Sequence, residues 1–123
     1  MHQSNTNSQF VIQQHGMPDG THWDLMLEKG DKLWTWRLDI HPAEIRQAVA
    51  AERIFDHPLK FLNYEGPVQN GTGNVLITDK GNYFFHDINA DKITFSLEGR
   101  LLNGRFTMII DNPPFWTFSP VDD

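Results

Sequence analysis

Hydrophobic and polar residues alternate with a period of two along most of the chain, and turn-forming residues interrupt the alternation at short intervals. Such alternation places successive side chains on opposite faces of a β-strand. Clusters of Gly, Asn, Asp and Pro mark the turns between strands. The pattern predicts strands over Phe10–Gln14, Thr21–Glu28, Leu33–Leu38, Leu59–Tyr64, Asn74–Asp79, Asn82–His86, Lys92–Glu98, Arg105–Ile110 and Phe115–Phe118. His15–Gly20 is predicted to be a loop, and Lys29–Lys32 a hairpin turn.

One segment, Pro42–Arg53, has a helical composition instead. It is rich in Ala, Glu, Arg and Gln, and proline suits the first position of a helix. Ile45, Ala48 and Val49 recur at helical spacing, so we expect an α-helix that packs across a barrel end or a sheet face. Eight or nine short strands, one helix and no regular βαβ alternation predict a mostly β fold. We expect a small antiparallel β-barrel of about eight strands with one flanking α-helix.

The length and composition of the chain constrain its domain organisation and its cellular compartment. A chain of 123 residues is long enough for one domain with its own core. We expect a flexible N-terminal arm over residues 1–9, the barrel domain over residues 10–119 and an acidic tail over residues 120–123. The chain has no cysteine, which excludes disulfides and thiolate chemistry and suits a reducing cytoplasm. No apolar run approaches the roughly 20 residues that span a bilayer, so we expect a cytoplasmic protein without a membrane partner.

The charge limits the kinds of partner. The net charge is −6, which disfavours tight non-specific binding to nucleic acid because such binding depends on neutralising phosphates. A local basic patch that touches a single strand end remains compatible with this balance.

The candidate chemistry lies in the predicted strand Thr21–Glu28. His22 and Asp24 are two residues apart and therefore point to the same face of that strand. A second histidine, His15, precedes His22 by seven residues. Two imidazoles and a carboxylate are a common ligand set for a divalent transition metal. We therefore take His15, His22 and Asp24 as candidate metal ligands, with surface or hydrogen-bonded roles as the alternative.

Several short sequence motifs occur in order along the chain. They are Phe10–His15 (FVIQQH), His22–Glu28 (HWDLMLE), Trp36, Asp56–Leu59 (DHPL), Tyr64–Gly66 (YEG), Leu97–Phe106 (LEGRLLNGRF) and Trp116. Together they resemble the 3′-phosphoesterase domain of bacterial DNA ligase D and its free-standing relatives, whose words run FVVQKH, LHYDFRLE, SWAV, EDHPLEY, FEG and L-x-G-x-x-L-x-G-x-W. The resemblance extends from about Phe10 to Phe118 and so covers nearly the whole chain.

The resemblance implies a fold, an activity and a set of site residues. The fold is a small β-barrel with the active site in its mouth or in a cleft. The activity removes a 3′-phosphate or a 3′-ribonucleoside from a DNA end with a divalent metal, Mn²⁺ above all, with Zn²⁺ or Co²⁺ as alternatives. The metal ligands map onto His15, His22 and Asp24. His57, in the DHP word, takes the catalytic role of contacting phosphate or transferring a proton; a structural turn at His57-Pro58 is the alternative.

The chain departs from the family at residues that handle phosphate. Met26 stands where the family has an arginine that clamps the phosphate. Phe55 replaces a glutamate, and Phe61 replaces a tyrosine. The usual lysine after SWAV has no match near Leu38-Asp39, and the loop Gly66–Asn74 is shorter than in the family. Losing a cation that stabilises the transition state commonly costs orders of magnitude in rate.

Two further expectations follow from these departures. The spacing from His15 to His22 is one residue longer than in the family, so we expect the intervening loop to bulge. Another arginine can replace the missing clamp, and the candidates are Arg37, Arg53, Arg100 and Arg105. Among these we favour Arg53 as the substrate-binding residue because it lies four residues before His57; a salt bridge at a helix end is the alternative.

The sequence leaves three functions open. The first is a metal-dependent phosphoesterase acting on DNA or RNA 3′ ends in repair, with any ligase or polymerase partner on other chains. The second is a catalytically impaired relative that serves as a binding or interaction module. The third is a phosphoesterase of small molecules on the same scaffold.

Overall fold

The computed structural model describes residues 8–68 and 73–121. Part of the predicted N-terminal arm is ordered, because Ser8 and Gln9 already belong to the first strand. Part of the predicted tail is also structured, since Pro120 ends the last strand and the amide of Val121 donates to Arg105 O at 2.8 Å. The remaining residues of the arm and tail, 1–7 and 122–123, lie outside the described part of the chain.

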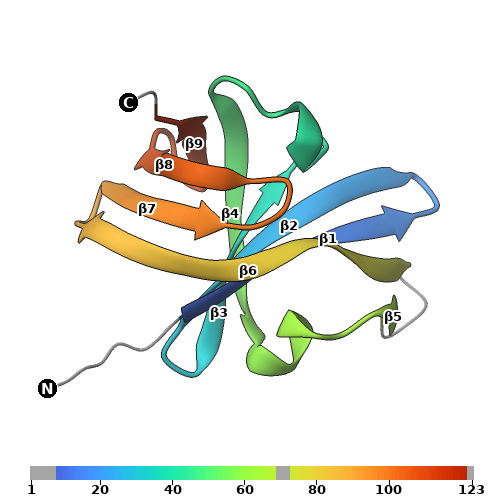
Figure 1. Ribbon diagram of the computed structural model, residues 1–123. Helices are drawn as coiled ribbons and strands as arrows, with labels where there is room; N and C mark the ends of the chain where they lie inside the picture. The colour runs from blue at the N-terminus through green and yellow to red at the C-terminus, as the bar shows by residue number, and fades with distance from the viewer. Residues whose placement is uncertain (1–7, 69–72, 122–123) are drawn as a thin grey trace, which may run out of the picture.

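The described residues form nine strands and two short 3-10 turns (Figure 1). They are β1 (Ser8–Met17), β2 (Gly20–Lys29), β3 (Lys32–Leu38), η1 (Pro42–Glu44), β4 (Val49–Pro58), η2 (Leu59–Leu62), β5 (Gly66–Pro67), β6 (Asn74–Ile88), β7 (Lys92–Glu98), β8 (Asn103–Ile110) and β9 (Phe115–Pro120). The strand order is β1-β2-β3-β4-β9-β8-β7-β6, and β6 pairs back with β1. This ring is a closed antiparallel barrel, while β5 pairs with the start of β6. The predicted mostly β barrel is confirmed.

The flanking α-helix predicted over Pro42–Arg53 is wrong. Its first residues form only the 3-10 turn η1, in which His41 Nδ1 accepts a hydrogen bond from the amide of Ala43. From Val49 onward the segment is a strand that pairs with both β3 and β9. Helix propensity amounts to tenths of a kcal/mol per residue. The barrel instead requires a strand here, because without β4 both β3 and β9 would end in unpaired edges.

Of three smaller predictions, two differ from the structure and one is confirmed. The strands predicted at Asn74–Asp79 and Asn82–His86 are one strand, β6, which pairs with β1 along its first part and with β7 along its second. The segment predicted as a strand at Leu59–Tyr64 is mostly the turn η2. The hairpin turn predicted at Lys29–Lys32 is confirmed, and Gly30 has the left-handed φ of 65° that a two-residue hairpin turn needs.

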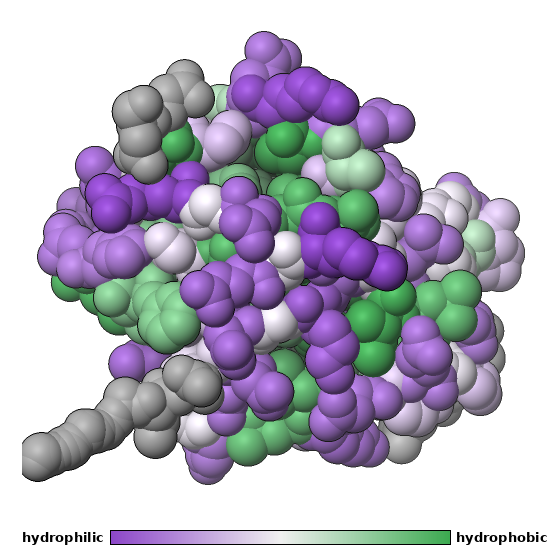
Figure 2. Space-filling view, in the orientation of Figure 1, coloured by the Kyte–Doolittle hydropathy of each residue, from purple (hydrophilic) through white to green (hydrophobic). Residues whose placement is uncertain are grey.

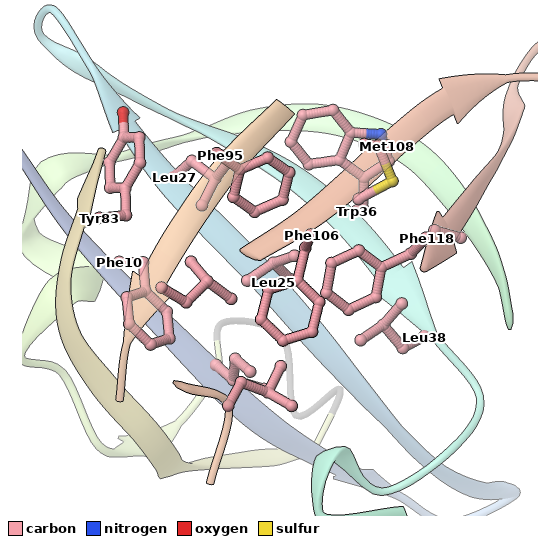
Figure 3. Packing of buried hydrophobic residues seen from close by; sticks show 14 of the residues in the cluster. Phe10, Leu25, Leu27, Trp36, Leu38, Tyr83, Phe95, Phe106, Met108 and Phe118 are labelled. Atoms are coloured by element: carbon pink, nitrogen blue, oxygen red, sulfur yellow. The ribbon is translucent and has the colours of Figure 1, made fainter. Parts of the chain in front are cut away.

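The main core fills the interior of the barrel (Figure 3). Phe95, Phe106 and Phe118 stack with ring centroids 5.1–6.4 Å apart, and Trp36 packs edge-on to Trp116 at 5.8 Å. Alternate residues of each strand supply this core, as the period-two pattern predicts. The labelled core residues of Figure 3 are Phe10, Leu25, Leu27, Trp36, Leu38, Tyr83, Phe95, Phe106, Met108 and Phe118.

A second apolar cluster lies on the opposite face of the same strands, outside the barrel wall. It consists of the buried residues Val11, Met26, Leu33 and Leu62, with Leu59, Phe61 and Ile77 packed against them. The segment from η2 to β5 covers this face. Its cover is fixed by Gln13, whose Nε2 donates to Phe61 O at 3.0 Å and to Tyr64 O at 3.1 Å. The space between wall and cover is where the candidate site forms.

Polar side chains dominate the face of the molecule shown in Figure 2, and they separate the apolar side chains into small patches. Over residues 8–68 and 73–121, no helix has the length and apolar character that crossing a membrane requires.

Candidate metal centre

The β1–β2 hairpin brings His15 and His22 directly opposite each other. The two strands pair without interruption from Phe10↔Leu27 to Met17↔Gly20, so only Pro18 and Asp19 form the turn. The predicted loop His15–Gly20 is therefore mostly strand, and the bulge expected between the two histidines is absent from this hairpin. Instead the two strands pair through to the turn, and His15 and His22 form a cross-strand pair with ring centroids 4.8 Å apart.

The donor atoms of His15, His22 and Asp24 all lie within 4.8 Å of one another. His22 Nε2 and Asp24 Oδ1 are 3.5 Å apart. Both atoms are buried, and neither makes a hydrogen bond within the described part of the chain. Burying a carboxylate oxygen without a hydrogen bond is costly. Two ligands of one transition-metal ion, each about 2.1 Å from it, are roughly 3–3.5 Å apart. The three residues therefore fit a divalent cation in donor type, and His22 and Asp24 also fit it in spacing, while His15 supplies a second imidazole within 4.8 Å of both. A bound cation would satisfy both buried atoms.

Arg37 is the cationic neighbour of this cluster. It lies directly across from Asp24 in the β2–β3 pairing, and its Nε is 3.8 Å from Asp24 Oδ1. Arg37 Nε is buried and, like the two atoms above, has no hydrogen-bond partner among the described residues. The side chain as a whole is 37% exposed, so it extends from the buried cluster to the surface.

His57 is held in one orientation by Thr35, a fully buried residue of β3. Thr35 Oγ1 donates to Leu33 O at 3.1 Å and lies 2.9 Å from His57 Nδ1. With the hydroxyl proton assigned to Leu33 O, the tautomer that fits this contact carries its proton on Nδ1 and has Nε2 as the acceptor. Burial lowers the pKa of His57 below 6.5, and the nearby charge of Asp24 opposes this only in part. His57 is therefore neutral at neutral pH.

His15 and Asp24 of the cluster line one cavity of about 170 Å³ together with His57, between the barrel wall and its cover. Two phenylalanines flank His57: the ring of Phe55 stacks on the imidazole at 4.7 Å, and Phe61 meets it edge-on at 5.5 Å. Phe55 is 72% exposed, although most large apolar residues of the protein are buried. The residues lining the cavity are Gln13, His15, Asp24, Phe55, His57, Pro58, Phe61, Val68 and Val75.

Gly73 allows the chain to approach His15 closely. It has a left-handed φ of 112°, and a Cβ placed on it would lie 2.2 Å from Gly16 O and 3.1 Å from His15 Nε2. A side chain at this position would therefore push against the imidazole of a candidate ligand.

Arg53 does not reach the cavity that His57 lines. Its guanidinium donates to Ile54 O at 2.7 Å and Asp56 Oδ1 at 2.9 Å, and it lies 4.9 Å from the ring of Trp36. The cause is a bulge in β4: Trp36 pairs with Arg53 but Leu33 pairs with His57, so one extra residue on β4 puts Arg53 and His57 on opposite faces. Arg53 lines a separate cavity with Trp34, Trp36 and Trp116.

Sequence reasoning did not single out Gln13 and Thr35, and it ranked Arg37 below Arg53. The predicted hairpin turn contained the information needed to place Arg37 beside Asp24. A two-residue turn that pairs Lys29 with Lys32 also pairs Asp24 with Arg37, because antiparallel partners have a constant sum of residue numbers. No comparable local signal marks Gln13, whose role depends on the distant segment that it fixes.

Comparisons with known proteins identify sequence relatives of the chain. A family model described as the DNA Ligase D 3′-phosphoesterase domain matches residues 13–110. The chain is 30% identical over 115 residues to the multifunctional non-homologous end joining protein LigD of Mycobacterium bovis, which covers 87% of this chain and 15% of the relative. The LigD of Pseudomonas aeruginosa is also 30% identical over 115 residues, with coverages of 84% and 13%. The chain thus spans about one seventh of the length of these relatives.

Proposed function

The chain belongs to the DNA ligase D 3′-phosphoesterase domain family, and from this premise we propose that it is a metal-dependent phosphoesterase of DNA repair. The proposed reaction removes a 3′-phosphate or a 3′-ribonucleoside from a DNA end and leaves a 3′-hydroxyl. One observation carries the proposal: His15, His22 and Asp24 converge on one point beside the cavity that His57 also lines.

His15, His22 and Asp24 are the residues that would hold the metal. Two nitrogen donors and one carboxylate oxygen suit Mn²⁺, which we propose as the ion, and also Zn²⁺ or Co²⁺. When bound, the ion supplies Lewis-acid chemistry, polarising a phosphoryl oxygen and lowering the pKa of a water. The burial of His22 and Asp24 supports this role, because it limits competition from bulk solvent for their donor atoms.

His57 is proposed to move a proton at Nε2. Thr35 holds the Nδ1–H side of the ring, and the lowered pKa keeps the ring neutral at neutral pH. A neutral imidazole with its lone pair on Nε2 accepts a proton from a nucleophile and then, once protonated, donates to a phosphate oxygen or a leaving group.

Phe55 favours a nucleotide substrate over a small phosphoester. Its exposed ring borders the cavity, and a nucleobase can stack on such a ring without regard to sequence. At about 170 Å³ the cavity is smaller than pockets that enclose drug-sized ligands, which fits a terminal phosphate or sugar rather than a whole nucleotide. We propose that the end group enters the cavity while an adjacent base rests on Phe55.

The test is a cleavage assay with Mn²⁺ and labelled primer-templates that end in a 3′-phosphate or a single ribonucleotide. We expect conversion to a 3′-hydroxyl by the wild type and by His86→Ala, an exposed histidine on β6, and loss of conversion in His22→Ala. Absence of turnover with Mn²⁺, Zn²⁺ and Co²⁺ alike would contradict the proposal. Turnover of generic phosphoesters without DNA-end activity would instead identify a small-molecule phosphoesterase.

A non-catalytic relative that binds metal or a partner is the second candidate. The observation that favours it is Met26, which is fully buried in the outer apolar cluster at the position of the family's phosphate-clamping arginine. Metal uptake without turnover on any of these substrates would support this candidate. In either case we propose that ligase or polymerase activities act on the same DNA ends.

A further inference from the structure

We infer that Arg37 binds the phosphate of the substrate in this site. The inference rests on the proposed function, because it names the residue that would hold the phosphoryl group beside the metal cluster. Phosphate recognition would then depend on β3, the strand that pairs with β2 and its two candidate ligands.

The position of Arg37 supports this role. Asp24 and Arg37 are directly paired across the antiparallel β2–β3 ladder, where opposite Cα atoms are about 4.5–5.5 Å apart. The position of Met26, two residues along β2, is about 6.6 Å from that of Asp24. An arginine at position 37 therefore starts at least as close to the cluster as one at position 26 would. Met26 itself packs on Val11, Leu33 and Leu62 and offers no polar group.

The contacts of Arg37 leave it suited to an anion. Its Nε is buried and lacks a hydrogen-bond partner among the described residues, and its 3.8 Å distance from Asp24 Oδ1 is too long for a hydrogen bond. An unbonded buried donor is costly, so a ligand that accepts from it gains that energy on binding. The guanidinium is planar and always charged, and it commonly binds phosphate through two parallel hydrogen bonds.

The neighbouring basic side chains are less well placed. Arg53 is bound to Ile54 O and Asp56 on the opposite face of β4. Lys60 lies over the ring of Phe61 and borders a different cavity. Arg37 is not itself part of the lining of the cavity that contains His57, but it lies beside Asp24, which is. In the described part of the chain, arginines and lysines form two ion pairs with carboxylates. The pair between Arg37 and Asp24 is the one that includes a candidate metal ligand.

A competing role for Arg37 is that of a counter-ion that only neutralises Asp24. The two roles differ in what removal of the charge does. Removing a counter-ion raises the affinity of Asp24 for a metal cation but leaves phosphate recognition unchanged. Removing a phosphate-binding residue lowers the preference for a phosphorylated end.

The experiment measures equilibrium binding by fluorescence anisotropy in EDTA, where metal-dependent turnover is suppressed. The probes are one labelled oligonucleotide with a 3′-phosphate and the same oligonucleotide with a 3′-hydroxyl. We expect the wild type to prefer the 3′-phosphate and Arg37→Met to lose roughly 10-fold or more of this preference. Arg37→Lys keeps the charge without the planar fork, so it should retain part of the preference. Arg105→Met is the matched control and should retain all of it, because Arg105 is an exposed arginine on β8, which pairs with β7 and β9 and not with the strands of the cluster.

Three outcomes would overturn the inference. They are a wild type without preference for the 3′-phosphate, an Arg37→Met variant with the preference of Arg105→Met, and an Arg37→Met variant whose only change is tighter Mn²⁺ binding, measured by a separate titration without EDTA. Circular dichroism and thermal melting check that each variant is folded, and Arg37→Lys provides a second reading if Arg37→Met is not. Loss of the preference in Arg37→Met together with no turnover by the wild type would support the inference while refuting the proposed function.

Discussion

The hydroxyl of Thr35 links the packing of the barrel wall to the orientation of His57. Replacing Thr35 by valine keeps the branched shape and removes only the hydroxyl. Two interactions are then lost: Leu33 O loses its donor at 3.1 Å, and His57 Nδ1 loses its partner at 2.9 Å. An unsatisfied buried group costs about 1–3 kcal/mol, so the free energy of unfolding should fall by about that amount. The imidazole, no longer held, would also populate the tautomer and rotamers that do not present Nε2 as the acceptor.

We therefore expect Thr35→Val to lower kcat on a 3′-phosphate primer-template by roughly 10-fold, with KM little changed, because orientation of the catalytic group is lost rather than substrate binding. Thr35→Ser keeps the hydroxyl and should retain most of kcat. Thr107→Val on β8, away from the site, controls for loss of a threonine hydroxyl. Urea unfolding measures stability alongside the kinetics. A Thr35→Val variant that is destabilised but has the wild-type kcat would refute the argument that Thr35 positions His57.

Three other predictions test separate parts of the molecule. Because burial lowers the pKa of His57 below 6.5, kcat/KM at saturating Mn²⁺ should be constant around neutral pH and fall only below pH 6.5. His57→Ala should lack this fall at low pH. The protein should also lose stability as the pH falls from 6.5 through the folded-state pKa of His57, because the unfolded chain then binds more protons. Phe55→Ala should weaken binding of a single-stranded 3′ end by about 1–3 kcal/mol without lowering the melting temperature, because the ring is 72% exposed; unchanged binding would remove the stacking role. Asp79→Ala should lower the free energy of unfolding in urea by about 3–5 kcal/mol, because the buried carboxylate accepts hydrogen bonds from four backbone amides at 2.8–3.1 Å. Asp87→Ala, at an exposed position of the same strand, should lower it little. Equal effects of the two substitutions would contradict this account.

The alternation of polar and apolar residues was sufficient to predict most strands, because each strand of the wall has one face in the barrel core. It failed at Pro42–Arg53, where helix-favouring residues form the strand β4 because the closed sheet needs a partner for β3 and β9. Local composition contains no information about such a long-range requirement.

The candidate site was predictable to the extent that it depends on neighbouring residues. His22 and Asp24 share a face because strands have a period of two, and this holds in the structure. The proximity of His15 could be inferred from the family resemblance, but its exact pairing with His22 depends on a two-residue turn. The placement of Arg53 was misjudged because a single bulge in β4 reverses the faces of all residues beyond it.

The same bulge brings His57 to the outer face of the wall. In a regular strand, Arg53 and His57 would lie on the same face, because they are an even number of residues apart. Bulges depend on how two strands fit each other, so they cannot be found from one strand alone. The segment η2 to β5, which covers the site through Gln13, is likewise placed by contacts distant in sequence.

The central claim is that His15, His22 and Asp24 hold one divalent cation. Isothermal titration calorimetry of the metal-free protein with Mn²⁺ tests it most directly, with Zn²⁺ and Co²⁺ titrated in parallel. We expect one ion per chain for the wild type and His86→Ala, and loss of binding in His22→Ala and Asp24→Asn. Heats that are the same for the wild type and these two cluster variants, or no uptake of any of the three metals, would contradict the claim.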